Sequence, residues 1–142
     1  MRREQFLVAE LHRLVPRIEE FIVVQDCPIP GACSMLRPDV LYDLGRCWIA
    51  LECDEGGLKH RETEGKYERI YRGLGSRPGF LIRINPDKMF RRRFHCNQGV
   101  MYQAGARFEP MMSTVATHME RMLKRGLGND HIEGVETTML FF

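Results

Sequence analysis

The sequence predicts an α/β fold in which a mixed sheet of about five strands is flanked by helices. Short apolar segments typical of strands alternate with longer segments whose apolar residues recur every three or four positions. One of the helical segments separates two strand segments, as in a crossover between parallel strands. The chain has 142 residues and a hydrophobic share of 44%, which suits one domain with one core over residues 1–142.

The first half of the chain contains one predicted helix and three predicted strands. The helix is marked by apolar residues at spacings of four, three and four, which are Leu7, Leu11, Leu14 and Ile18. Pro16 should kink or end this helix. Residues 21–24 form the first strand, and a turn-rich loop over 27–35 follows. Residues 40–44 and 47–54 form the next two strands, which a tight turn at Gly45-Arg46 joins.

The second half contains two helices and two strands. A helix with an apolar face at Tyr67, Ile70, Tyr71 and Leu74 is ended by the glycines and proline that follow it. Residues 80–84 form a strand, whereas no regular structure is predicted for the basic segment 88–107. Residues 112–123 form an amphipathic helix whose methionines fill the core or, in a rival interpretation, contact a partner. Residues 137–142 form the final strand.

Composition excludes several classes of protein. No apolar run approaches the roughly 20 residues of a membrane-spanning helix. The amino terminus lacks the features of a secretory signal, so we expect an intracellular protein of the cytoplasm or nucleus that is not secreted. The five cysteines are odd in number and contain no CxxC pair, which argues against a disulfide framework and against a zinc ribbon. A net charge of +2 does not by itself indicate a nucleic-acid binder.

Three carboxylates are expected to converge at one end of the sheet. Glu52 and Asp54 lie two residues apart at the end of an apolar strand, so they project to the same side, while Cys53 faces the core. The hairpin returns the chain beside Asp39. Crowded carboxylates repel each other unless a cation lies among them, and Mg²⁺ or Mn²⁺ suits such oxygen ligands. Such an ion activates water against a phosphodiester. The alternative is that these acids are solvated residues at a strand end.

The same residues resemble a known family. The segments Arg37-Pro38-Asp39, 49–55, His60, Glu68-Arg69 and 80–87 are similar to the PD-(D/E)XK nuclease superfamily. The resemblance is to the branch related to very-short-patch-repair endonucleases, with homing-endonuclease-like and giant-virus proteins. It covers residues 36–88 well and the remainder loosely.

The resemblance implies a restriction-endonuclease-like sheet and a Mg²⁺-dependent endodeoxyribonuclease. Asp39 matches the metal-binding aspartate of the Pro-Asp motif, and Glu52 matches the acid of the (D/E)XK motif. Asp54 stands where the superfamily's lysine usually stands, and Lys59 is a candidate to replace that lysine. His60 matches the branch's histidine, a general acid/base or a group that positions water.

Basic residues are candidates for contacts with DNA, the expected partner. Arginine can pair two phosphate oxygens at once, which favours this role for Arg69, Arg72 and Arg83. Arg83 is alternatively a buried partner of Glu55 or Glu68. The run Arg91, Arg92 and Arg93 either contacts DNA or is a solvated surface. A homodimer is one arrangement in which so small a domain cuts both strands.

Two rival functions stay open from the sequence. One is a catalytically inactive protein that binds nucleic acid on the same fold without a divalent ion. The other is an assembly protein in which the acids are surface residues and the helix carrying Met119 and Met122 packs against a partner. The feature that favours catalysis over both is the placement of mutually repelling acids at the end of an apolar strand.

Overall fold

The main sheet of this computed structural model has five strands in the order β1-β2-β3-β4-β7. The structure describes residues 2–25, 38–56, 68, 72–95 and 99–142. The strands are β1 (Ile22–Gln25), β2 (Val40–Asp43), β3 (Trp48–Cys53), β4 (Gly79–Ile84) and β7 (Val135–Leu140). β1, β2 and β3 pair antiparallel, whereas β4 is parallel to both β3 and β7. The predicted mixed five-stranded α/β fold is confirmed.

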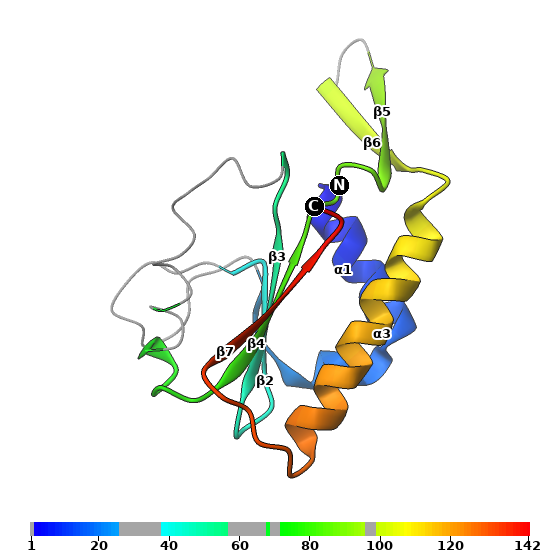
Figure 1. The fold of residues 1–142 in the computed structure, drawn as a ribbon. Helices are drawn as coiled ribbons and strands as arrows, with labels where there is room; N and C mark the ends of the chain where they lie inside the picture. Colours follow the sequence, from blue (N-terminus) through cyan, green and yellow to red (C-terminus); the bar gives the residue numbers. More distant parts are fainter. Residues whose placement is uncertain (1, 26–37, 57–67, 69–71, 96–98) are drawn as a thin grey trace.

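Two helices, α1 (Arg3–Leu14) and α3 (Phe108–Leu127), cover the same face of the sheet (Figure 1). Pro16 ends α1 as predicted, because the chain continues from there as the 3-10 helix Pro16–Phe21. The predicted crossover helix before β4 lies largely outside the described residues. Within that segment the structure describes Glu68, Arg72 and Gly73 as helical. None of the helices in the described part of the chain is long and apolar enough to cross a membrane.

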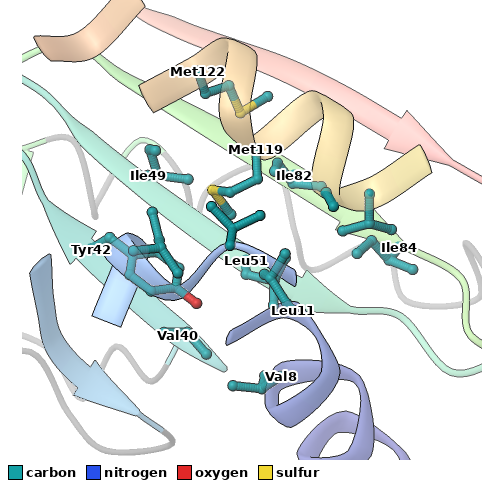
Figure 2. Packing of buried hydrophobic residues seen from close by; sticks show 14 of the residues in the cluster. Val8, Leu11, Val40, Tyr42, Ile49, Leu51, Ile82, Ile84, Met119 and Met122 are labelled. Carbon is teal, nitrogen blue, oxygen red and sulfur yellow. The ribbon is translucent and has the colours of Figure 1, made fainter. Parts of the chain in front are cut away.

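The hydrophobic core lies on both faces of the central strands. The larger cluster fills the space between the sheet and the two helices (Figure 2), and its members include Val8, Leu11, Val40, Tyr42, Ile49, Leu51, Ile82, Ile84, Met119 and Met122. A second cluster on the opposite face contains Val24, Leu41, Trp48, Ala50 and Leu81. A strand beside a parallel neighbour is commonly buried on both faces. The methionines of α3 therefore fill the core, so they do not offer the partner surface that the assembly interpretation requires.

A two-residue turn joins β2 to β3 and sets their register. The Leu44 N–H donates to the Cys47 carbonyl at 2.9 Å, and Gly45 supplies the positive φ of 95° that the turn requires. The Asp43 carboxylate caps the turn by accepting from the Gly45 N–H at 2.8 Å. Asp43 also pairs with Arg77 through two hydrogen bonds, which hold the pKa of that carboxyl below its usual value.

Residues 88–107 contain regular structure, so the prediction for this segment was wrong. β5 (Phe90–His95) and β6 (Gly99–Ala104) pair antiparallel as a two-stranded ribbon separate from the main sheet. The alternation of polar and apolar residues that marks a strand arises when one face packs on a core. Three successive arginines in β5 do not show this alternation, although the backbone of β5 pairs with that of β6.

The last strand is displaced toward the amino terminus relative to the prediction. β7 begins at Val135 and ends at Leu140, two residues before the expected end. Phe141 has a φ of 68°, which is incompatible with a strand. The aromatic end of the chain therefore leaves the sheet, and the Phe142 ring centroid lies 6.0 Å from the guanidinium carbon of Arg83.

We expect the stability of the fold to depend on pH through His12. Its Nε2 lies 2.9 Å from the Tyr42 hydroxyl, and burial lowers the His12 pKa, against which Glu19 acts weakly. The unfolded chain therefore binds this proton more readily than the folded one, so the free energy of unfolding should fall as pH drops below about 6.5. Thermal midpoints at pH 7.5 and pH 5.0 should show a larger decrease for the wild type than for His12→Gln. Equal decreases would remove His12 as the cause.

Candidate active site

Asp39 is fixed at the end of β3 by the pairing of β2 with β3. The register places Val40 opposite Leu51, so Asp39, which directly precedes β2, falls beside Glu52. One oxygen of Asp39, Oδ2, accepts a hydrogen bond from the Cys53 N–H at 2.6 Å. The structure therefore brings the aspartate of the Pro-Asp motif together with the Glu-x-Asp end of β3.

Glu52 and Asp54 lie in different electrostatic surroundings. Glu52 is 6% exposed and faces away from the main core, on the side where Trp48 and Ala50 are buried. Asp54 directly follows β3, and its Oδ2 accepts from the Nε of Arg83 at 2.8 Å. This ion pair places a cation directly beside Asp54.

Arg83 belongs to the interior of the site. It is 8% exposed and lies opposite Glu52 in the parallel pairing of β3 with β4. Its carboxylate partner is Asp54, while Glu55, one of the partners considered from the sequence, pairs instead with Arg3. The hydrogen bond to Asp54 uses one of the five N–H donors of the guanidinium, and the DNA-binding role of Arg83 stays a prediction.

The charges of four carboxylates act on the Cys53 thiol. Burial raises the pKa of Cys53 well above its usual value, and the charges of Asp39, Glu4, Glu52 and Asp54 raise it further. The thiolate is the nucleophilic form of cysteine, so Cys53 stays protonated and inert at neutral pH. These four acids lie in or directly beside α1, β2 and β3, so negative charge is concentrated at this end of the sheet.

Glu4 is a member of this acidic group that the sequence did not suggest. It lies in the first turn of α1, and its Oε1 is 3.0 Å from an Arg2 guanidinium nitrogen. Together with Asp39 it lines a cleft of about 330 Å³, whose other lining residues are Arg2, Gln5, Val8 and Gln25. Acids in the first turn of a helix are common because they interact favourably with the helix dipole. Glu4 differs from other first-turn acids because the packing of α1 against the sheet places it at the cleft.

Arg3 joins the segments that border the site. Its guanidinium contacts Glu55, where Nη2 lies 2.8 Å from Oε2. It also contacts Asp87, where Nη1 lies 3.2 Å from Oδ1. Asp87 also accepts from the Gly56 N–H at 3.0 Å, which connects the chain after β3 with the chain after β4. The guanidinium carbon of Arg3 lies 4.3 Å from the centroid of the Tyr102 ring on β6.

Some of the carboxylates at this site are suitable ligands for a magnesium ion. Asp39 and Glu52 offer the carboxylate oxygens that Mg²⁺ prefers, and Glu4 lines the cleft together with Asp39. Asp54 already pairs with the cation of Arg83, which offsets part of the negative charge that it could offer to a metal. Within the described residues, no group of three or more His, Cys, Asp or Glu is arranged to hold a metal ion. The complete ligand set therefore stays a prediction.

The other predicted site residues are distributed as follows. Lys59, His60 and Arg69 lie outside the described residues. Arg72 is exposed and lies 3.8 Å from Glu68 on its own helix, which is a weak surface ion pair. The arginine run is part of β5, and Arg91 at its start is exposed.

Comparison of the chain with protein-family models, with curated proteins and with solved structures found no match. The chemistry of the site is therefore argued from its own residues. Glu52 is buried, whereas Glu4, Asp39 and Asp54 are partly exposed. A group of acids beside an open cleft can bind a divalent cation or a cationic group. Phosphodiester hydrolysis and cation binding without catalysis are both compatible with that chemistry.

Proposed function

We propose that this chain is a metal-dependent endonuclease that hydrolyses phosphodiester bonds in DNA. The observation that carries the proposal is the hydrogen bond from the Cys53 N–H to Asp39 Oδ2, at 2.6 Å. It holds the aspartate of a Pro-Asp motif against the Glu-x-Asp end of β3, where acids repel each other without a cation. The resemblance of the motifs to PD-(D/E)XK nucleases supports the same function.

Each acid has a distinct role in this proposal. Asp39 and Glu52 would hold Mg²⁺ or Mn²⁺, with Glu4 nearby to bind a water molecule of the ion. When bound, the ion would lower the pKa of a water molecule and stabilise negative charge on the phosphate. Arg83 positions Asp54 and limits the excess of negative charge. His60 is proposed to assist the water or the leaving group, and Lys59 to replace the lysine of the superfamily.

The proposal extends to partners and location. DNA is the substrate, and a homodimer is the form in which two small domains would cut both strands. We propose an intracellular location, in the cytoplasm or nucleus, because the proposed substrate is DNA.

The test is a cleavage assay on supercoiled plasmid and on branched DNA. We expect nicking or linearisation of at least one substrate with Mg²⁺ or Mn²⁺, and no product with EDTA. Glu52→Gln should remove this activity because it removes a metal-binding charge while keeping the shape of the side chain. A folded wild-type protein that cuts neither substrate and binds neither metal would refute the proposal.

One observation favours the rival in which the fold binds DNA without cutting it. The ion pair between Arg83 and Asp54 occupies an acid oxygen at the position where a catalytic lysine is usual in the superfamily. In that case DNA binding would persist in EDTA and in Asp39→Ala. The cleavage assay and a binding assay on the same protein separate the two functions.

A further inference from the structure

Two successive arginines at the start of α1 lie in different surroundings. The Arg3 side chain is 13% exposed and contacts Glu55 and Asp87, which belong to the segments that follow β3 and β4. The Arg2 side chain is 59% exposed and lines the cleft together with Asp39. Arg3 therefore holds the start of α1 against the end of the sheet (Figure 1), while Arg2 brings its guanidinium to the cleft.

The backbone of Arg2 is fixed by the first turn of α1. Its N–H donates to the Gln5 side-chain oxygen at 2.9 Å. Its carbonyl accepts from the N–H groups of Gln5 and Phe6, at 3.0 and 3.2 Å. Because both polar groups of the Arg2 backbone are engaged, the root of the side chain is anchored beside the cleft.

Arg2 carries the positive charge among the described residues that line the cleft, whose acids are Glu4 and Asp39. Glu52, beside Asp39 in the pairing of β2 with β3, adds a third carboxylate. A divalent cation would offset two of these three formal charges, and Arg2 offsets the third. Without Arg2 the site would keep a net negative charge, which would repel the negative charge of a phosphodiester.

Arginine also has the geometry that a phosphate requires. A guanidinium pairs with two phosphate oxygens through parallel N–H donors. It has five such donors, so one arginine can contact a carboxylate and a phosphate together. Arg2 already contacts Glu4, with 3.0 Å between Nη2 and Oε1. A phosphate that enters the cleft beside Glu4 is therefore within the range of a group that suits it.

We propose that Arg2 contacts the phosphate of the DNA bond that is cut and stabilises the negative charge that develops on its oxygens. The water oxygen bonds to phosphorus, and the bond from phosphorus to one sugar oxygen breaks. One proton of the water ends on that leaving oxygen, and the other stays on the phosphate or passes to solvent. Arg2 transfers no proton, because a guanidinium stays protonated. This role rests on the proposed function, whereas the phosphate contact is measurable without cleavage.

The experiment compares the wild type with Arg2→Gln and Arg2→Lys. Fluorescence anisotropy measures binding of labelled 20-base-pair DNA in Ca²⁺ over a range of salt concentrations. One lost phosphate contact reduces the salt slope by about 0.9, so Arg2→Gln should bind about 8-fold more weakly at 0.1 M salt. Single-turnover cleavage of plasmid in Mg²⁺ should fall about 100-fold, the usual effect of removing one donor to developing charge. Arg2→Lys keeps the charge and should recover the salt slope.

A matched control lies at the other end of α1. Arg13 is 68% exposed and pairs with an acid of its own helix, Glu10, as Arg2 pairs with Glu4. Arg13→Gln should bind and cut DNA like the wild type. Equal losses in Arg13→Gln and Arg2→Gln would overturn the inference.

A second background separates a phosphate contact from a role exerted through Glu4. In Glu4→Gln, the further change Arg2→Gln should still reduce the salt slope by about 0.9. No further change in slope would show that Arg2 acts through Glu4, and would overturn the inference. Binding that depends on Arg2 without any cleavage by the wild type would uphold the phosphate contact and refute the nuclease. Cleavage at equal rates by the wild type and Arg2→Gln would overturn the inference and leave the nuclease in place.

Discussion

Asp39→Asn is expected to lower the rate of DNA cleavage about 1,000-fold, because the loss of roughly 4 kcal/mol of transition-state stabilisation by a metal ligand corresponds to that factor. The substitution removes the charge that would bind the ion. It keeps an oxygen that can accept from the Cys53 N–H, so the junction of β2 with β3 should be retained. Single-turnover cleavage of plasmid at saturating Mg²⁺ measures the effect.

The control for this prediction lies on the same strand. Asp43→Asn makes the same chemical change at the opposite end of β2, where the carboxylate pairs with Arg77 and lies away from the acidic cleft. We expect wild-type cleavage from this variant. If Asp43→Asn and Asp39→Asn lose activity equally, the effect is on folding, and the metal-binding role of Asp39 is refuted.

Gly79→Ala is expected to lower the free energy of unfolding by about 3 kcal/mol, at the upper end of the usual cost of overpacking a core. Gly79 begins β4 and pairs directly with Trp48 on β3. A Cβ at this position would fall within the indole ring system of Trp48. The ring cannot move aside easily, because it is fully buried and its Nε1 donates to the Arg77 carbonyl at 2.9 Å.

A double-mutant cycle tests that cause directly. In a Trp48→Leu background the added methyl group has room, so Gly79→Ala should cost less than about 1 kcal/mol there. Urea denaturation of the wild type, both single variants and the double variant measures the coupling. The same cost in both backgrounds would show that Gly79 is required for its backbone and not for its contact with Trp48.

The main sheet was predictable because its strands are apolar and its connections are short. The turn at Gly45-Arg46 allows little freedom of register, so the sequence already placed Asp39 near Glu52. The bounds of β7 were predicted less accurately. The apolar residues Phe141 and Phe142 continue the apolar pattern of the strand, although the backbone has already turned away from the sheet.

The remainder of the site depends on contacts between distant segments. Glu4 reaches the acidic group only because α1 packs across the sheet, and no local pattern reports that packing. The pairing of Arg83 with Asp54 depends on the parallel register of β3 and β4, which is set by a crossover and not by a turn. The ribbon was missed because the three successive arginines in β5 do not show the polar–apolar alternation of a half-buried strand.

The position of β7 has a consequence for synthesis on the ribosome. β4 is a central strand only because β7, more than fifty residues later in the chain, pairs with its outer edge. While a nascent chain has not yet released residues 135–140, β4 presents a row of unpaired backbone groups beside an apolar surface, a template for association with other chains. We therefore expect this protein to depend on chaperones during translation more than its small size suggests, and to be intolerant of truncation before Leu140.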